Sequence, residues 1–463
     1  MHLRILLNFN RYYYILFPGT TDLATLEGRA ADRYCHAAWT TIATVVARVI
    51  ALIAGLISVP LTIHYLGGER FGLWMTITAA VSMLQFADLG IGNGLLNKIA
   101  EAIGRDDRES IRLLINTGMA VLGLIGIFLI GLFAMVNTFI SWPTIFNATS
   151  ADAISEAGST TAVLIVIFAL NIMLSPIVRI NMGLQRGYIN GIWQIIGSII
   201  GLLALIIALQ LKVGLPILVA SYMSGPVLAT VANGFLLFLH THPWAKPSLG
   251  TIDLSIARSL IVLGFWFLLF QIVVSVNNAI PNLVISHVLS LNQVAIFAVA
   301  LKLASIAVIL QSAILMPLWP AYAEARTCGD WAWIKRTLIR SLVLSGAIGL
   351  VGSTLMVVFG PTIIRIWIGA DTIPPRGVLW GLGVWVLSSS LYGPLTMFLN
   401  GMGRIRIQAI YGIIFSIFML CTCIVLVKLF NLSGVAWAYG VTYTLPSIAV
   451  SSFIVYNYFY VKK

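Results

Sequence analysis

The chain has 463 residues, of which 60% are hydrophobic and 9% are charged, and its mean hydropathy is +0.99. This composition excludes an ordinary soluble domain and predicts an all-α polytopic membrane protein. The formal net charge is +12. Its basic residues are spread over separate connections between apolar segments, so they indicate membrane topology rather than binding of nucleic acid.

Residues 1–38 form a more polar N-terminal segment. The apolar stretch at residues 12–17 is too short to span a bilayer, and Pro18 and Gly19 interrupt it. No convincing cleavable signal peptide precedes the first long apolar run. We expect a poorly ordered cytoplasmic extension or, as the alternative, a helix that lies in the membrane interface.

Twelve apolar runs follow, each long enough to cross a hydrocarbon core of about 30 Å as a helix. Six of them lie in residues 39–245, the expected N-terminal six-helix bundle, and six lie in residues 246–463, the expected C-terminal bundle. The runs occupy residues 42–63, 71–96, 112–136, 161–180, 188–210, 214–239, 260–288, 294–318, 335–359, 376–399, 406–430 and 434–459.

Lysine and arginine alternate between the two sides of the predicted membrane. The connections after spans two, four, six, eight and ten are basic, whereas the opposite connections carry few cations. By the positive-inside rule, both termini are therefore expected in the cytoplasm. The basic connections contain Lys98, Arg105, Arg108, Arg112, Arg179, Arg186, Lys246, Arg258, Arg326, Lys335, Arg336, Arg340, Arg404 and Arg406.

Two blocks of rare polar and turn residues recur in the second half of the chain. At an offset of 223 residues, Asp107 matches Asp330, and the triplet Ala-Glu-Ala at 100–102 recurs at 323–325. At an offset of 218, Gly183 and Arg186 match Gly401 and Arg404. Since six crossings separate the copies, the repeats should be parallel. Such duplication is typical of transporters in which one bundle moves against the other.

The connection between spans one and two contains the motif YLGGERFG at residues 65–72. Gly67 and Gly68 allow a tight reversal, and Glu69 and Arg70 are expected to keep the turn in water. The motif resembles the corresponding turn of bacterial polysaccharide and O-antigen exporters. These are the lipid-linked oligosaccharide flippases of the multidrug/oligosaccharidyl-lipid/polysaccharide (MOP) superfamily.

The resemblance extends over residues 39–463 and includes the turns at 183–187 and 401–404. It implies twelve transmembrane helices in two parallel-repeat six-helix bundles around a central cleft, in the bacterial plasma (inner) membrane. It also implies a lipid-linked oligosaccharide substrate, contacts with membrane lipids and, as possible partners, polysaccharide assembly proteins. Relatives often carry an acid near the end of span seven, where this chain has Pro281 and Asn282. Ion coupling through that acid is therefore in doubt.

Three charged residues lie inside predicted spans, namely Arg48, Asp88 and Lys302. A charge at the centre of a spanning helix costs about 2.5–3.5 kcal/mol, so each should face protein or water. In the functional interpretation, Arg48 and Lys302 line the cleft and attract a sugar diphosphate, while Asp88 pairs with a cation or takes a proton. In the structural interpretation, Arg48 and Asp88 simply pair between adjacent helices.

Uncharged polar residues within the spans complete the candidate substrate site. Gln271, Asn277 and Gln311 are suited to hydrogen-bond sugar hydroxyls, and they are equally suited to join neighbouring helices. The four cysteines have no metal-ligand spacing, so we expect structural thiols, no metal and no cofactor.

We therefore expect a membrane transporter, not an enzyme. It would flip an isoprenoid-diphosphate-linked oligosaccharide or polysaccharide precursor from the cytoplasmic to the outer leaflet by alternating access. One alternative is a cation-coupled drug exporter of the same superfamily. Another is a membrane glycosyltransferase or polymerase, which would usually need catalytic acids in a sizeable exterior loop. The longest such connection, residues 137–160, offers only Asp152 and Glu156.

Overall fold

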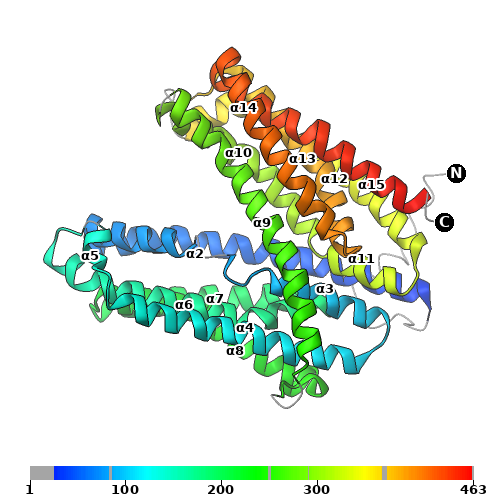
Figure 1. Ribbon diagram of the computed structural model, residues 1–463. Helices are drawn as coiled ribbons and strands as arrows, with labels where there is room; N and C mark the ends of the chain where they lie inside the picture. The colour runs from blue at the N-terminus through cyan, green and yellow to red at the C-terminus, as the bar shows by residue number, and fades with distance from the viewer. Residues whose placement is uncertain are drawn as a thin grey trace. The chain divides into compact units, whose positions relative to one another are not determined.

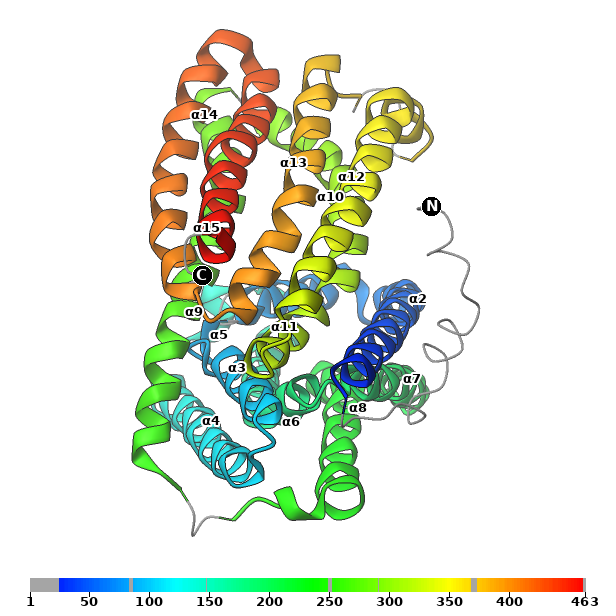
Figure 2. The same ribbon diagram turned by 90° about the vertical axis from the view of Figure 1, so that its right-hand side faces the viewer.

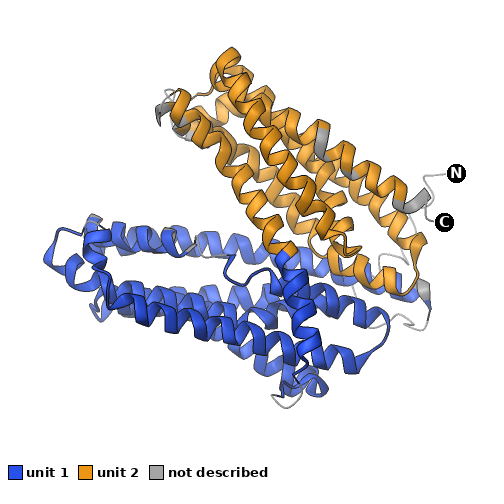
Figure 3. Ribbon diagram, viewed as in Figure 1, with its two compact units in different colours: residues 1–265 blue, residues 266–463 orange. Residues whose placement is uncertain are grey.

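The computed structural model describes residues 25–82, 86–146, 148–248, 252–289, 291–367 and 373–460. These residues are helices and short connections, and they contain no β-strand. The chain divides into two compact units, residues 1–265 and residues 266–463 (Figure 3). The division lies inside a long helix, α9 (Leu254–Val288). The boundary at 245/246 between the two expected bundles stays a prediction.

The N-terminal unit consists of long helices that pack against their neighbours along much of their length (Figure 1). Its helices are α2 (Leu26–Ser82), α3 (Ile91–Gly104), α4 (Arg108–Asn137), α5 (Trp142–Ile145), α6 (Ala151–Gly183), α7 (Gly187–Gln210) and α8 (Leu215–Leu236). The most extensive packing is between α7 and α8, between α2 and α7, and between α4 and α6. A π-helical turn η3 (Leu237–Thr241) and a 3₁₀ turn η4 (Pro243–Ala245) end this series before α9 begins.

The C-terminal unit repeats this plan, with α13 packed between α12 and α14 (Figure 2). Its helices, after the end of α9, are α10 (Leu291–Leu315), α11 (Leu318–Thr327), α12 (Trp331–Trp367), α13 (Arg376–Gly401), α14 (Ile405–Thr442), the π-helix η7 (Tyr443–Ile448) and α15 (Ala449–Tyr460).

Ten helices among the described residues are long and apolar enough to cross a membrane. Two of the long helices also contain a non-helical residue at which the chain changes course. Gly67 (φ 75°) divides α2, and Asn431 (φ 50°) divides α14. The twelve expected spans would require a further crossing after each of these two residues. The predicted fold class, an all-α polytopic membrane protein with two repeats, is confirmed.

Two expected segments differ from the structure. The second span was expected to be continuous over residues 71–96, but α2 ends at Ser82 and residues 86–90 form a turn before α3 begins. Leu89 (φ 52°) and Gly90 (φ 70°) both adopt the left-handed conformation in that turn. In the N-terminal segment, residues 1–24 lie outside the described residues. From Leu26 onward the chain is helical and continuous with span one, and Arg33 is only 1% exposed.

The duplication is visible in the backbone of the connections. Asp107 and Asp330 both cap the helix that follows, accepting a hydrogen bond from the backbone N–H three residues later, at 3.0 Å and 3.1 Å. Immediately before each cap, Asp106 (φ 55°) and Gly329 (φ 73°) adopt the same left-handed conformation. The later turns match as well, since Gln185 has a φ of 58° and its counterpart Gly403 has a φ of 68°.

Equivalent glycines pack against equivalent helices in the two units. A Cβ on Gly183 would lie 2.8 Å from Ile99 Cγ2. On Gly401 it would lie 2.5 Å from Tyr322 Cβ and 2.8 Å from the Trp319 carbonyl oxygen. Ile99 and Tyr322 are themselves related by the offset of 223 residues. The absence of a side chain thus lets the turn after α6 approach α3, and the turn after α13 approach α11.

Each unit has its own apolar core. In the N-terminal unit Leu95, Ile99 and Ile115 belong to one buried cluster, and in the C-terminal unit Phe297 and Val386 belong to another. Many large apolar side chains are exposed along the long helices, as expected where the surroundings are lipid rather than water.

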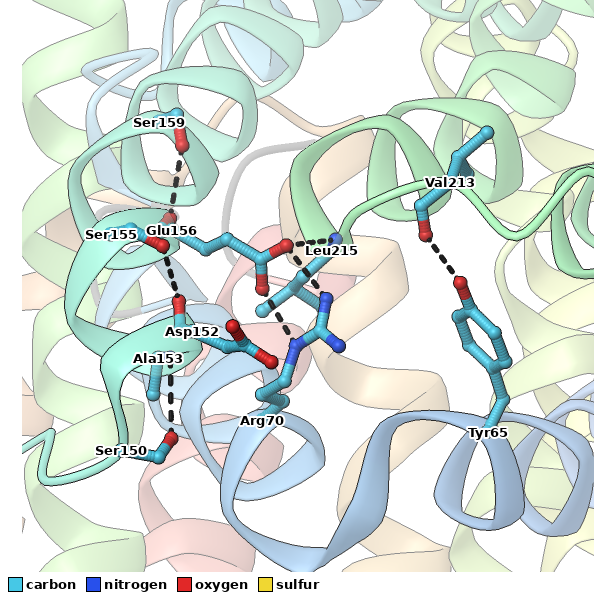
Figure 4. A network of polar contacts seen from close by, with 10 residues as sticks. All are labelled: Tyr65, Arg70, Ser150, Asp152, Ala153, Ser155, Glu156, Ser159, Val213 and Leu215. Carbon is cyan, nitrogen blue, oxygen red and sulfur yellow. Dashed lines mark hydrogen bonds and ion pairs between the residues drawn. The ribbon is translucent and has the colours of Figure 1, made fainter.

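A polar network joins three connections at the end of the N-terminal unit that carries α5 (Figure 4). Arg70 donates two hydrogen bonds to the Glu156 carboxylate, from Nε at 2.7 Å and from Nη2 at 2.6 Å. Glu156 also accepts a hydrogen bond from the Leu215 backbone N–H at 3.0 Å. Tyr65 donates to the Val213 carbonyl at 2.9 Å. The network ties α2, α6 and the connection between α7 and α8 together.

Glu69, the neighbouring residue of the turn motif, caps α6 from outside that helix. Its Oε1 accepts hydrogen bonds from the backbone N–H groups of Thr149 and Ser150, at 2.6 Å and 2.9 Å, and from the Thr149 hydroxyl at 2.9 Å. These donors stabilise the carboxylate and lower the pKa of Glu69 to about 2. The expectation that Glu69 and Arg70 merely keep the turn in water was therefore incomplete, because each makes specific contacts.

Candidate functional site

Asp88 lies in the turn that interrupts the second span, not in the middle of a helix. Its Oδ1 accepts a hydrogen bond from the Gly90 backbone N–H at 2.9 Å, which closes a short turn immediately before α3. Aspartate favours such turns because its carboxylate bonds to backbone N–H groups two residues later. The predicted intramembrane acid thus helps to form the break in the helix.

The cation beside Asp88 is Arg179 of α6. The Asp88 carboxylate and the Arg179 guanidinium attract one another. Their atoms converge on Gly92, because a Cβ there would lie 3.2 Å from Arg179 Nε and 3.3 Å from Asp88 Oδ2. Arg179, expected at the junction of span four and the connection that follows it, lies in the last turns of α6, which continues to Gly183. Asp88 is therefore partnered by α6 rather than by Arg48 of α2.

Arg48 and Lys302 lie on spanning helices, as predicted from the sequence. Arg48 is half-buried in α2, within the candidate span Gly28–Gly67. Lys302 is exposed in α10, within the candidate span Ile296–Thr327. No hydrogen bond or ion pair of the Lys302 ammonium group is formed with the described part of the chain. Their role in binding substrate remains a prediction.

Gln311 makes an interhelical contact inside the C-terminal unit. It is 2% exposed, and its side-chain Nε2 donates to the backbone carbonyl of Ser390 in α13. The same amide group lies against Gly393, where a Cβ would approach Nε2 to 3.1 Å. At least one hydrogen bond of this amide is thus used to join α10 to α13.

Gln271 and Asn277 of α9 keep polar atoms that the described residues do not satisfy. Gln271 Nε2 and Asn277 Oδ1 are both buried, and neither has a hydrogen-bond partner among those residues. The backbone carbonyl of Asn277, in contrast, accepts a hydrogen bond from the Tyr439 hydroxyl at 3.3 Å. Buried polar atoms without partners are costly and are found at functional positions more often than elsewhere.

An aromatic group surrounds this part of the C-terminal unit. The rings of Trp385 and Tyr439 lie 5.4 Å apart, and Tyr443 lies 6.1 Å from Trp385 and 6.3 Å from Tyr439. Tyr392 extends the group, with its ring 6.1 Å from that of Tyr443. Tyr443 begins the π-helix η7, an irregularity that often marks a functional position. These aromatic residues pack within and against the apolar core of the C-terminal unit, and the Tyr439 hydroxyl connects them to the backbone of α9.

Neither the pairing of Arg179 with Asp88 nor this aromatic group is predicted from the sequence. Arg179 lies at the end of the fourth apolar run, and nothing in its local sequence identifies a partner on another segment. The tyrosines had a weaker signal. Tyr439 and Tyr443 lie well inside the last apolar run, whereas tyrosine in membrane helices is enriched near the two interfaces.

Buried amides also join the helices of each unit. In the N-terminal unit, Asn181 Nδ2 donates to Asn190 Oδ1 at 2.9 Å and to Asn233 Oδ1 at 3.1 Å, which links α6, α7 and α8. In the C-terminal unit, Gln408 Nε2 donates to Asn400 Oδ1 at 2.9 Å across the turn between α13 and α14. Asn190 and Gln408 are related by the offset of 218 residues. We assign these amides to helix packing.

The chain is similar in sequence to proteins of polysaccharide assembly. The profile of a family described as polysaccharide biosynthesis protein matches residues 38–326. A curated protein of Salmonella typhi, proposed to be an O-antigen transporter, is 24% identical over 298 residues. That alignment covers 63% of this chain and 66% of the relative, so the chain spans slightly less than two thirds of the relative's length. The resemblance inferred from residues 65–72 is confirmed.

Solved structures of MOP superfamily transporters have the same fold. An outward-facing multidrug resistance MATE family transporter matches with a TM-score of 0.77 and 14% identity, covering 91% of this chain and 95% of that chain. MATE in the bent conformation matches with a TM-score of 0.80 and 15% identity, covering 92% and 96%. A MOP superfamily transporter from Pyrococcus furiosus, described with a binding pocket of reversed polarity, matches with a TM-score of 0.76 and 14% identity, covering 91% and 96%. At this identity the likeness establishes the fold and not the substrate.

Proposed function

Because the chain belongs to the polysaccharide biosynthesis protein family and is a multi-pass membrane transporter of the MOP superfamily, we propose that it flips a lipid-linked sugar precursor. The substrate class would be an oligosaccharide or polysaccharide precursor linked through a diphosphate to an isoprenoid lipid. Transport would run from the cytoplasmic to the outer leaflet of the bacterial inner membrane by alternating access.

The family match carries this proposal. It extends over residues 38–326, which include the turn motif and all three predicted intramembrane charges, Arg48, Asp88 and Lys302. The Salmonella typhi relative, itself proposed to transport O-antigen, supports the same substrate class.

The charges inside the spans suit an anionic head group. Arg48 and Arg179 in the N-terminal unit and Lys302 in the C-terminal unit outnumber the acid Asp88. We propose that Arg48 and Lys302 each attract the diphosphate, since guanidinium and ammonium groups bind phosphate oxygens strongly where water is scarce. Outward movement of an anion is favoured by about 2.3 kcal/mol per charge for each 100 mV of interior-negative potential.

Polar atoms of the C-terminal unit suit the sugar. Gln271 Nε2 is a free donor and Asn277 Oδ1 is a free acceptor within the described residues, so together they match the two roles of a sugar hydroxyl. We propose that these amides bind sugar hydroxyls, whereas Gln311 serves mainly to join α10 and α13. A cationic drug is a less suitable substrate, because it would be repelled by Arg48 and Lys302.

The proposal is tested by measuring lipid-linked sugar in each leaflet of cells that lack the chain and of cells that express variants. Loss of the chain should leave the precursor in the cytoplasmic leaflet, provided that no related exporter is present. Arg48→Gln and Lys302→Gln should each slow its appearance in the outer leaflet about tenfold, the effect of losing roughly 1.4 kcal/mol of binding.

Lys428→Gln provides the matched control, because Lys428 is an exposed cation of α14. This variant should transport at the wild-type rate. Normal transport in cells without the chain would exclude the flippase assignment. Normal transport by both Arg48→Gln and Lys302→Gln would exclude only their proposed role.

A further inference from the structure

A cluster of basic side chains, two arginines and a histidine, lies at one end of the N-terminal unit, where three connections meet. Arg108 is the first residue of α4, Arg186 directly precedes α7, and His242 follows η3. Trp244 of η4 lies between two of them. The Arg108 guanidinium is 5.8 Å from the centre of its ring, and the His242 ring is 5.8 Å away in an edge-on orientation. We call Arg108, Arg186 and His242 the cationic cluster.

His242 occupies a strongly positive field. Burial lowers the pKa of its imidazole, and the charges of Arg186 and Arg108 lower it further. Its Nδ1 is buried and has no hydrogen-bond partner among the described residues. The imidazole is thus held next to two guanidinium groups with one nitrogen left unused.

The acids closest to Arg108 in the sequence form no ion pair with the cluster. Asp106 forms an ion pair with Arg29 at 2.8 Å. Asp107 accepts hydrogen bonds from the backbone N–H and the hydroxyl of Ser110, at 3.0 Å and 2.6 Å. Glu109 is exposed and directly follows Arg108 on α4, and consecutive residues on a helix point in different directions.

No described acid forms an ion pair with either Arg108 or Arg186. Two guanidinium groups, an imidazole nitrogen without a hydrogen-bond partner among the described residues and an aromatic ring therefore lie close together with no described acid paired to either guanidinium. Guanidinium groups bind phosphate oxygens through two parallel hydrogen bonds, so the missing counter-ion is best supplied by a phosphate.

The position of the cluster indicates where that phosphate comes from. His242 and Trp244 directly follow the candidate span Leu215–Thr241, so they lie at the depth where an apolar helix meets the aqueous boundary. Tryptophan is enriched at that depth in membrane proteins, beside the lipid head groups. We propose that the cationic cluster binds the phosphate of an anionic phospholipid, with Trp244 lying against the lipid at the level of its head group.

This lipid site is separate from the proposed transport site, because it uses none of the intramembrane charges assigned to the sugar diphosphate. The full chain, purified in detergent, can be examined by native mass spectrometry after addition of phosphatidylglycerol or phosphatidylcholine. The wild-type chain should retain about one more phosphatidylglycerol than the double variant Arg108→Gln/Arg186→Gln, whose affinity should fall about tenfold or more. Phosphatidylcholine retention should be the same for both.

Two further variants separate the site from general attraction by charge. Arg112→Gln removes an exposed cation one turn along α4, and it should bind phosphatidylglycerol like the wild type. His242→Phe keeps an aromatic ring against Trp244 and removes only the nitrogens, so it should lose part of the affinity. Equal loss in Arg112→Gln and the double variant would overturn the proposal, because binding would then follow net charge alone.

A competition experiment identifies the source of the phosphate. Inorganic phosphate at millimolar concentration should leave phosphatidylglycerol bound if the lipid chains and Trp244 contribute to the site. Displacement by inorganic phosphate would show a site for a free anion and would refute the lipid assignment. Labelling of the buried Cys35 reports whether the double variant is folded, and protection equal to the wild type is required before its lipid binding is interpreted.

Discussion

The ion pair between Arg70 and Glu156 should make a measurable contribution to the stability of the N-terminal unit. The two hydrogen bonds are 2.7 Å and 2.6 Å long, and both side chains are 17% exposed. A hydrogen bond to a charged group contributes about 1.5–3 kcal/mol when buried, whereas exposed ion pairs contribute about 0–1 kcal/mol. For this partly buried pair we expect a coupling free energy of about 1–2 kcal/mol in a double-mutant cycle.

The cycle uses Arg70→Gln, Glu156→Gln and the double variant. Glu156→Gln should be the more damaging single change. The amide nitrogen of the new glutamine would face the N–H donors of Arg70. The variant would also lose the carboxylate that accepts a hydrogen bond from the Leu215 backbone N–H. We expect this variant to lose about 2–3 kcal/mol, with a lower midpoint of unfolding by about 4–10 °C. Asp152→Asn, a change of the same charge one turn earlier on α6, should cost less than 1 kcal/mol.

Thiol labelling during heating gives the midpoint for each unit. Cys35 is buried in the N-terminal unit and Cys423 in the C-terminal unit, so a chain that retains one of them reports that unit. The variants should advance labelling of Cys35. Additive effects of Arg70→Gln and Glu156→Gln, with no coupling within about 0.3 kcal/mol, would show that the contact in Figure 4 does not stabilise the unit.

Three further outcomes follow from the contacts. Gly401→Ala should lower stability by about 1–3 kcal/mol in the same assay, because its Cβ would meet α11, while Gly131→Ala, with open space around it, should not. Gln408→Leu should cost about 1–2 kcal/mol by leaving the Asn400 carbonyl oxygen without this donor. Glu69→Gln should be destabilising at pH 7. Folding lowers the pKa of Glu69 from near 4.5 to about 2. The difference in stability between the wild type and Glu69→Gln should therefore be full above pH 4.5 and should vanish as the pH falls through 2.

The features that sequence predicted best depend on local chemistry. Asp107 and Asp330 cap helices through their own backbone neighbours, and a cap needs no partner from elsewhere in the chain. The apolar runs likewise predicted most spans, since a bilayer requires helices of a certain length. The repeat was predictable for the same reason, because its matching residues lie in turns and caps.

The features that sequence did not predict depend on contacts between distant segments. High hydropathy through residues 71–96 outweighed the local turn signals of Asp88 and Gly90, so the span was expected to be continuous. The cationic neighbour of Asp88, Arg179, lies on another helix and could not be inferred from spacing. Glu69 and Arg70 are expected from the sequence to be solvated turn residues, because their partners, Thr149 and Ser150 for Glu69 and Glu156 for Arg70, are distant in the chain. Of the candidate substrate residues, Gln311 was placed on the correct helix, but its bond to α13 could not be inferred from spacing.

The two units keep the same connections and differ in the polar groups within their spans. Helix caps, left-handed turns and close glycine contacts determine the direction in which each helix follows the one before it. A substitution at one of these positions would therefore alter the path of the chain. Asp88 and Arg179 in the first unit have no charged counterparts at Gln311 and Met397, their positions by the two offsets. The second unit has instead Lys302, two amides with unused atoms and a group of tyrosines. Duplication thus preserved the contacts that fold each unit, whereas the polar groups within the spans diverged. Such divergence suits the proposed sugar lipid, which would need different contacts for its phosphates and its hydroxyls.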